Sequence, residues 1–297
     1  MIAVPASFSI LYQSLATNPL FSSMSTLLFS IDLEEFYPAH PGLENRATSV
    51  RELVDRYLEL LSRHGAYATF FVVGELARKY PDVLRHIAAA GHELGCHGDL
   101  HRTLDEFDRN TFATDLQRNR KAVEDAVGVP VEGFRAPLLS LTSDRVWAYE
   151  VLAQEGFRYS SSVLPASNPL YGWPGFGTSV RQISGVWEIP ITLSHLPFFV
   201  QLPLYCGTYF RVLPWWLVQF KLKRDRSYPF VTSYFHPYDI DFQQPWTMHR
   251  NAGNNPLHNA LLFWRRKSLL RRMNGFFNAI PQRETYRQYV SRLCSHS

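Results

Sequence analysis

The 297-residue sequence lacks most features of secreted and membrane proteins. It has only three cysteines, Cys96, Cys206 and Cys294, which are scattered and odd in number. A disulfide framework is therefore not expected, and a reducing compartment is favoured. No run of eighteen apolar residues occurs, so no transmembrane helix is expected. The first 28 residues have no basic segment and no long apolar core, which argues against a signal peptide. These absences predict a cytoplasmic protein, for which Met24 is an alternative start to Met1.

The chain also lacks a strong charge of either sign. Its net charge is +4, with 46% hydrophobic and 19% charged residues, a balance typical of folded globular proteins. Basic residues gather at 221–226 and 264–273 rather than along a face with a reading motif. A nucleic-acid partner is therefore not expected.

From residue 26 onward, short apolar runs alternate with amphipathic segments. This alternation predicts βα units around a parallel sheet, and the number of units favours a (β/α) barrel over a short open sheet. In such barrels the chemistry lies at the C-terminal ends of the strands. The predicted strands lie within 26–33, 67–74, 92–98, 131–137, 185–193 and 229–240, and the predicted helices within 49–65, 80–91, 104–128 and 143–156.

Four polar clusters follow predicted strands, at 30–36, 95–101, 133–137 and 233–239. Residues two apart in a strand face the same way, so Asp32 and Glu34 can point together into the barrel mouth. One carboxylate and two imidazoles form the protein ligand set of a catalytic zinc or a related divalent metal. A second carboxylate can then accept a proton from water, and a distant histidine can protonate the leaving group.

Each cluster also has a structural interpretation when taken alone. An isolated pair such as His97 and His101 is most often a pair of surface histidines. Arg135 could form a structural ion pair, and His236 could be an ordinary loop residue. The coincidence of four such clusters at strand ends favours a common site.

Six stretches of the chain share a known family pattern: "FSIDLEEF", "ATFFVVGELARKYPDVLRHIAAAGHELGCHGDLH", "GFRAPLLS", "GFRYSSSVLP", "GTYFRVLP" and "YFHPYDID". On these stretches the chain resembles the polysaccharide deacetylases of the NodB-homology group, carbohydrate esterase family 4. The resemblance covers about residues 26–245, and its closest match is the branch that lacks a signal peptide and accompanies exopolysaccharide and lipopolysaccharide biosynthesis. It implies a distorted (β/α) barrel with fewer than eight regular strands.

The resemblance also implies roles for individual residues. Asp32 corresponds to the general base, and Arg135 to the arginine that pairs with this base and orients it. His97 and His101 correspond to the two metal-binding histidines, and His236 to the general acid. The metal would be zinc, with cobalt, manganese, nickel or iron as alternatives.

The third metal ligand departs from the commonest family pattern, in which two aspartates are adjacent. Leu33 follows Asp32 here, so the ligand must be Glu34 or Glu35. Strand alternation favours Glu34, although a bulge would exchange their faces. Further candidates for substrate contacts are Pro137, Tyr209 and Phe210.

The expected organisation has three parts: an N-terminal extension (1–25), the barrel (26–250) and a basic C-terminal segment (251–297). Apolar and basic residues in 257–280 are spaced as in an amphipathic helix, which either packs on the barrel or contacts a membrane peripherally.

The implied activity is removal of an N-acetyl or N-formyl group from an amino sugar, in a glycan or in a lipid- or nucleotide-linked precursor. A hydrolase of non-sugar cyclic amides and an inactive glycan-binding protein are the alternatives.

Overall fold

The fold is that of a computed structural model, which describes residues 25–35, 49–168, 170–196, 201–225, 228–247 and 255–295. The expected N-terminal extension therefore lies outside the described residues, apart from Ser25. Among the described helices, none has the length and apolar character needed to cross a bilayer.

The predicted parallel sheet is present. Within the described residues, eight strands form one curved sheet in the order β10-β1-β2-β3-β4-β5-β7-β6, and only the pairing of β6 with β7 is antiparallel. The strands are β1 (Thr26–Leu33), β2 (Thr69–Val72), β3 (Glu93–Cys96), β4 (Gly133–Phe134), β5 (Tyr159–Ser160), β6 (Arg181–Ile183), β7 (Val186–Glu188) and β10 (Phe230–Phe235). A separate hairpin pairs β8 (Ser194–His195) with β9 (Gln201–Leu202). The fold is a distorted (β/α) half-barrel, as expected from the sequence, although the described sheet has eight strands rather than the fewer that were expected.

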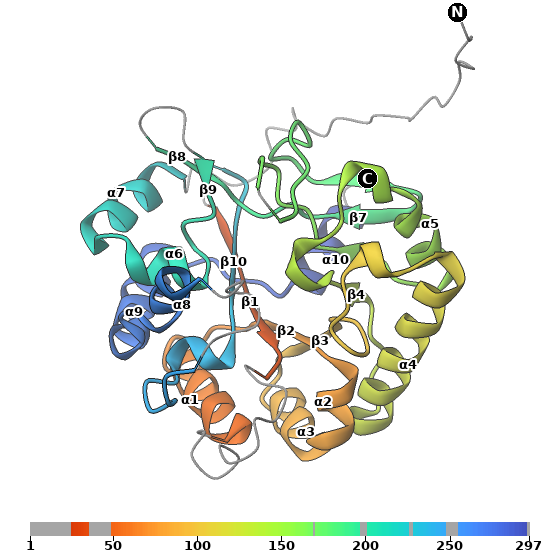
Figure 1. The fold of residues 1–297 in the computed structure, drawn as a ribbon, viewed down its shortest axis with the longest axis horizontal. Helices are drawn as coiled ribbons and strands as arrows, with labels where there is room; N and C mark the ends of the chain where they lie inside the picture. Colours follow the sequence, from red (N-terminus) through yellow and green to blue (C-terminus); the bar gives the residue numbers. More distant parts are fainter. Residues whose placement is uncertain are drawn as a thin grey trace, which may run out of the picture.

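Helices surround this sheet (Figure 1), with α2 to α5 beside β2 to β4 and α6 to α9 beside β10. Their amphipathic faces explain the arrangement, because α1, for example, buries seven residues of one face. The residue before this helix, Ser49, caps it, since its hydroxyl accepts a hydrogen bond from the backbone N–H of Glu52. The helices are α1 (Val50–Arg63), α2 (Gly74–Lys79), α3 (Pro81–Ala89), α4 (Arg109–Val127), α5 (Trp147–Gln154), α6 (Gly207–Val212), α7 (Trp215–Asp225), α8 (Pro256–Phe263), α9 (Leu269–Ala279) and α10 (Tyr286–Cys294).

Strand β1 shows how the two faces of the sheet differ. Leu27, Phe29 and Ile31 pack in the main core under the helices, whereas Leu28 packs on the other face in a second core. That second core also contains Tyr286 from α10. Because side chains alternate along a strand, the face that begins with Leu28 continues through Ser30 to Asp32. The second face of β1 therefore changes from apolar to polar toward the C-terminal end of the strand.

The C-terminal segment differs from the expected single amphipathic helix. Its described residues include α8, a 3₁₀ turn η7 (Arg266–Ser268), α9 and α10, and the expected helix over 257–280 is interrupted at Arg265, whose φ is +58°. A residue with a side chain rarely adopts this left-handed backbone conformation inside a helix, so α8 does not continue past this point. The apolar side of α9 lies in the main core, and Arg266 and Arg272 are buried. This packing gives no support to peripheral membrane contact through the segment.

Candidate active site

The register of the sheet brings the polar clusters to one edge. Leu33, Val72, Cys96 and Phe134 are successive partners across β1, β2, β3 and β4. The residues that follow this row include Glu34, His97 and Arg135, so all three leave the sheet at the same level. On the other side of β1, Phe235 pairs with Ile31, which puts His236 level with Asp32. Parallel strands thus bring together residues that are up to 204 positions apart.

Glu34, His97 and His101 form a cluster with the composition of a metal site. One ligand atom of each residue lies within 4.8 Å of the others, and Glu34 and His97 are buried. The His97 and His101 rings are 5.1 Å apart, and His101 Nε2 contacts a Glu34 carboxylate oxygen. Glu35 is exposed instead and pairs with Lys79 at 2.9 Å.

The protonation chemistry of the cluster suits a divalent cation. Burial lowers the pKa of His97 to about 4, so its imidazole is neutral near pH 7, as metal binding requires. His97 Nδ1 lies 2.8 Å from the carbonyl oxygen of Arg135; donation there leaves Nε2 as the ligand atom. Burial alone would raise the pKa of Glu34, but the charge and hydrogen bond of His101 hold it well below its usual value. A carboxylate oxygen and two imidazole nitrogens are donor types that bind zinc and similar ions.

The loop that carries His101 is fixed by its neighbours. Gly98 has a φ of +74°, which glycine adopts without strain, and its carbonyl accepts hydrogen bonds from Gly74 N and Asn119 Nδ2. Asp99 N donates to Asp115 at 2.9 Å. These contacts fix the residues that precede His101, which itself has a left-handed conformation (φ +54°), unusual for a residue with a side chain.

Asp32 lies beside this cluster and is held by Arg135. Arg135 Nη1 donates to Asp32 Oδ1 at 2.7 Å and to Ser30 Oγ at 2.6 Å. The arginine is fully buried, and burial would lower the pKa of its guanidinium, but the Asp32 charge raises it above its usual value. Its Nη2 also donates to Tyr286 Oη at 3.0 Å. Asp32 therefore has a fixed orientation.

His236 lies on the other side of Glu34, with Nε2 3.6 Å from Glu34 Oε1. Its Nδ1 lies 3.2 Å from Asp239 Oδ2, and Arg211 donates to the other Asp239 oxygen at 2.8 Å. Burial would lower the pKa of His236, but the hydrogen bond with Asp239 and the Glu34 charge raise it to about 9. A protonated imidazole near neutral pH can donate a proton.

Several residues of this arrangement were not predicted from the sequence. Asp239 lies three positions after His236, a spacing that could have suggested the contact. Tyr238 donates to Glu34 Oε1 at 3.0 Å and stacks on the His236 ring at 4.6 Å. Arg211 and Tyr286 had no local signal, because each reaches the site from a distant helix.

The three expected substrate contacts have different environments. Pro137 is buried close to Gly98, and Tyr209 is 37% exposed. Phe210 is fully buried and packs against Phe235 in the main core, so the expectation that it lines the mouth does not fit its position. In its α6 segment the apolar side turns inward, and sequence alone does not distinguish that side from a pocket wall.

Cys96 also lies away from the cluster, although it precedes His97. It is fully buried in the main core, and burial raises the pKa of its thiol well above the usual value. Alternation along β3 puts it on the opposite face from His97.

Two family models match adjacent parts of the chain. The model described as polysaccharide deacetylase matches residues 45–159, and a domain of unknown function (DUF3473) matches residues 161–280. His97, His101 and Arg135 lie in the first region and His236 in the second.

Curated relatives match parts of the same chain. A peptidoglycan-N-acetylglucosamine deacetylase of Bacillus cereus is 27% identical over 100 residues, which cover 33% of this chain and 36% of the relative. A chitooligosaccharide deacetylase of Azorhizobium caulinodans is 34% identical over 80 residues, which cover 27% of this chain and 38% of the relative. The chain thus spans less than two fifths of the length of either relative.

A solved structure matches over almost the whole chain. It is described as a proposed polysaccharide deacetylase from Mycobacterium smegmatis, with a TM-score of 0.62, 21% identity and coverage of 94% of this chain and 93% of that one. This likeness concerns the fold. The family model leads to one assignment: residues 45–159 form a polysaccharide deacetylase domain.

Proposed function

We propose that the protein is a metal-dependent deacetylase that hydrolyses the N-acetyl or N-formyl amide of an amino sugar, in a glycan or in a lipid- or nucleotide-linked precursor. The observation that carries the proposal is the cluster of Glu34, His97 and His101, whose ligand atoms lie within 4.8 Å of one another. Relatives named for deacetylation of peptidoglycan N-acetylglucosamine and of chitooligosaccharides support an amino-sugar substrate.

Glu34 Oε and the two histidine nitrogens would hold one divalent ion, most suitably zinc. When bound, such an ion supplies Lewis acidity, which makes water a better nucleophile and polarises the amide carbonyl.

The remaining steps belong to side chains of this chain. Asp32 accepts the proton of the water that attacks the carbonyl carbon, and Arg135 keeps its carboxylate directed at that position. His236 donates a proton to the amide nitrogen as the C–N bond breaks, which releases the free amine together with acetate or, from an N-formyl group, formate. Asp239 holds Nδ1 of this imidazole, so that Nε2 faces the centre.

The test measures metal content and acetate release from N-acetylated chitooligosaccharides, with zinc, cobalt or manganese supplied. The wild-type protein should bind about one ion per chain and release acetate, and His101→Ala should lose both properties. His86→Ala is the matched control, because His86 is a half-exposed histidine on α3 that pairs with Asp55. A folded wild-type protein that takes up none of these metals would refute the proposal.

A further inference from the structure

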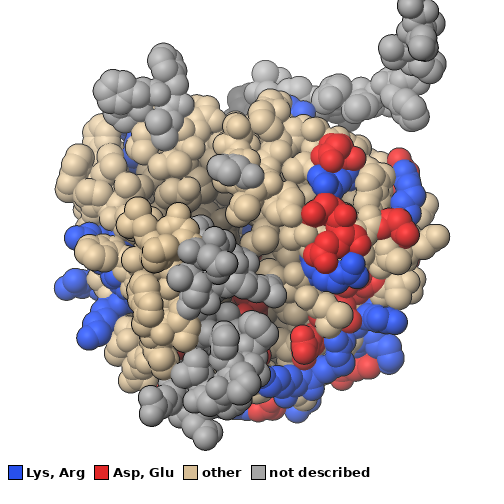
Figure 2. Space-filling model, in the orientation of Figure 1, with Lys and Arg blue, Asp and Glu red and all other residues tan. Residues whose placement is uncertain are grey.

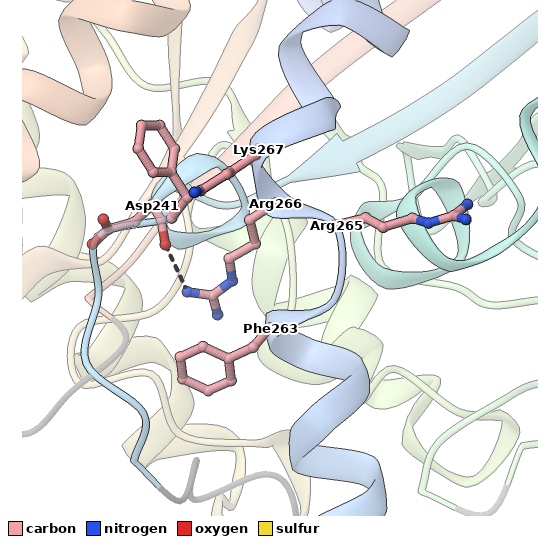
Figure 3. A pocket seen from close by; sticks show the side chains of 6 residues that line it. Asp241, Phe263, Arg265, Arg266 and Lys267 are labelled. Atoms are coloured by element: carbon pink, nitrogen blue, oxygen red, sulfur yellow. Dashed lines mark hydrogen bonds between the residues drawn. The ribbon is translucent and has the colours of Figure 1, made fainter.

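A small pocket lies next to the candidate active site. It has a volume of about 260 Å³ and is lined by residues that follow His236 and by the junction of α8 with η7: Asp241, Phe242, Phe263, Arg265, Arg266 and Lys267. Figure 3 shows the Arg266 side chain between Asp241 and Phe263, whereas Arg265 points away from them. The pocket lies entirely within the part of the chain that matches the domain of unknown function.

The pocket carries an excess of positive charge. Arg266 and Lys267 contribute two cations against the single carboxylate of Asp241, whereas the Arg265 side chain points away. Arg266 is buried, and it donates to the carbonyl oxygens of Leu262 and Asp241 at 2.8 and 3.1 Å. These uncharged acceptors orient the guanidinium without cancelling its charge. Burial, followed by the nearby charge of Arg211, lowers the pKa of Arg266 to about 10, as expected where positive charges accumulate.

Aromatic rings alternate with these cations. The Phe242 ring is 46% exposed, and it lies 5.7 Å from Lys267 Nζ and 5.5 Å from the Arg56 guanidinium. Arg266 lies 4.2 Å from the Phe263 ring. Flat apolar faces beside fixed cations suit a sugar ring that carries an anionic group better than they suit a small free anion.

Tyr238 connects the pocket with the candidate active site. The Arg266 guanidinium lies 5.8 Å from the Tyr238 ring, and Tyr238 Oη donates to Glu34. One tyrosine thus contacts Glu34 of the candidate active site and Arg266 of the pocket. A glycan with one sugar at Glu34 and His236 would therefore bring its neighbouring sugar toward the pocket.

We propose that this pocket binds an anionic group, a carboxylate or a phosphate, carried by the substrate glycan beside the sugar that loses its acetyl group. The proposal rests on the proposed deacetylase function, and it narrows the substrate class to acidic amino-sugar glycans. The basic residues of the C-terminal segment would then serve substrate recognition.

Isothermal titration of the metal-free full chain tests this assignment without turnover. The neutral probe is tetra-N-acetylchitotetraose, and the carboxylate probe is a hyaluronan tetrasaccharide, which alternates glucuronate with N-acetylglucosamine. N-acetylglucosamine 1-phosphate against N-acetylglucosamine gives the phosphate arm. At least one anionic probe should bind about tenfold more tightly than its neutral counterpart, as expected of a hydrogen bond to a charged group.

Lys267→Gln should weaken binding of the preferred anionic probe about two- to fivefold, the effect of one exposed ion pair, and should leave the neutral probe unchanged. Arg271→Gln is the matched control, since Arg271 is exposed on α9 and does not line the pocket. Equal affinities of wild type for anionic and neutral probes, or equal effects of the two substitutions, would overturn the proposal. Acetate release from chitotetraose by the zinc-supplied protein, measured separately, distinguishes loss of the deacetylase function from loss of this pocket.

Discussion

Replacement of Arg135 by methionine tests how far the candidate site depends on one buried cation. The guanidinium is fully buried and makes five hydrogen bonds. Methionine fills much of the same volume but donates none of these bonds, and it leaves the Asp32 carboxylate buried without its partner. Removal of one member of a buried ion pair typically costs about 3–5 kcal/mol. For a chain of this size, we expect the midpoint of thermal unfolding to fall by roughly 6–20 °C.

A double-mutant cycle separates the ion pair from the loss of packing. Asp32→Asn alone keeps the other four hydrogen bonds of Arg135 and should cost less than Arg135→Met. The double variant has no unpaired carboxylate, so it should be at least ~1 kcal/mol more stable than the sum of the two single effects. Urea unfolding in the presence of a chelator measures these terms without a contribution from bound metal. An Arg135→Met protein within ~1 kcal/mol of wild type would refute the reasoning.

Three other substitutions test separate parts of the structure. Glu34→Gln should weaken binding of a divalent ion about a hundredfold, whereas Glu35→Gln should leave this binding unchanged. Metal analysis after gel filtration measures both, and an equal loss of metal in the two variants would contradict Glu34 as the ligand. Burial lowers the pKa of His92 to about 4, below the usual 6.5, so protonation of the unfolded chain should cost up to ~3 kcal/mol as pH falls from 6.5 to 4. The free energy of unfolding of His92→Phe, measured with urea, should fall less than that of wild type between pH 6.5 and 4. An equal fall in the two proteins would contradict a lowered pKa of His92. Phe210→Ala should lower the free energy of unfolding, measured with urea, by about 3–5 kcal/mol. If the ring only contacted substrate, its removal would lower kcat/KM without this loss of stability.

The sequence predicted the elements that position the site because their signals are local. Strand β1 and helix α1 have clear hydrophobic periods, and the polar clusters follow strands directly. Once parallel pairing was expected, the C-terminal ends of the strands had to meet at one edge. That argument needed no knowledge of which side chains touch. It predicted that Glu34 lies close to His97 and His101, and these residues lie close together in the structure.

The contacts that the sequence did not reveal are those between elements far apart in the chain. Tyr286 reaches Arg135 from α10, across 151 positions, and nothing near either residue indicates the pairing. The apolar residues of the C-terminal segment have the spacing of one continuous helix, yet the helix is interrupted at Arg265. The next residue, Arg266, turns inward and donates hydrogen bonds to Asp241 and Gln244. Tertiary contacts thus override the local helical pattern.

The second half of the chain has a chemical reason to accompany the first. The metal-ligand candidates come from the first 101 residues, but the candidate acid His236 and its partner Asp239 lie beyond residue 160. Arg211 ties that pair to the C-terminal helices, because Nη1 donates to the carbonyl oxygens of Leu262 and Trp264 while Nη2 holds Asp239. A chain that ended near residue 160 would keep the candidate ligands and lose both the candidate acid and the residues that set its protonation state. The region of unknown function therefore completes the candidate site that the preceding part of the chain begins.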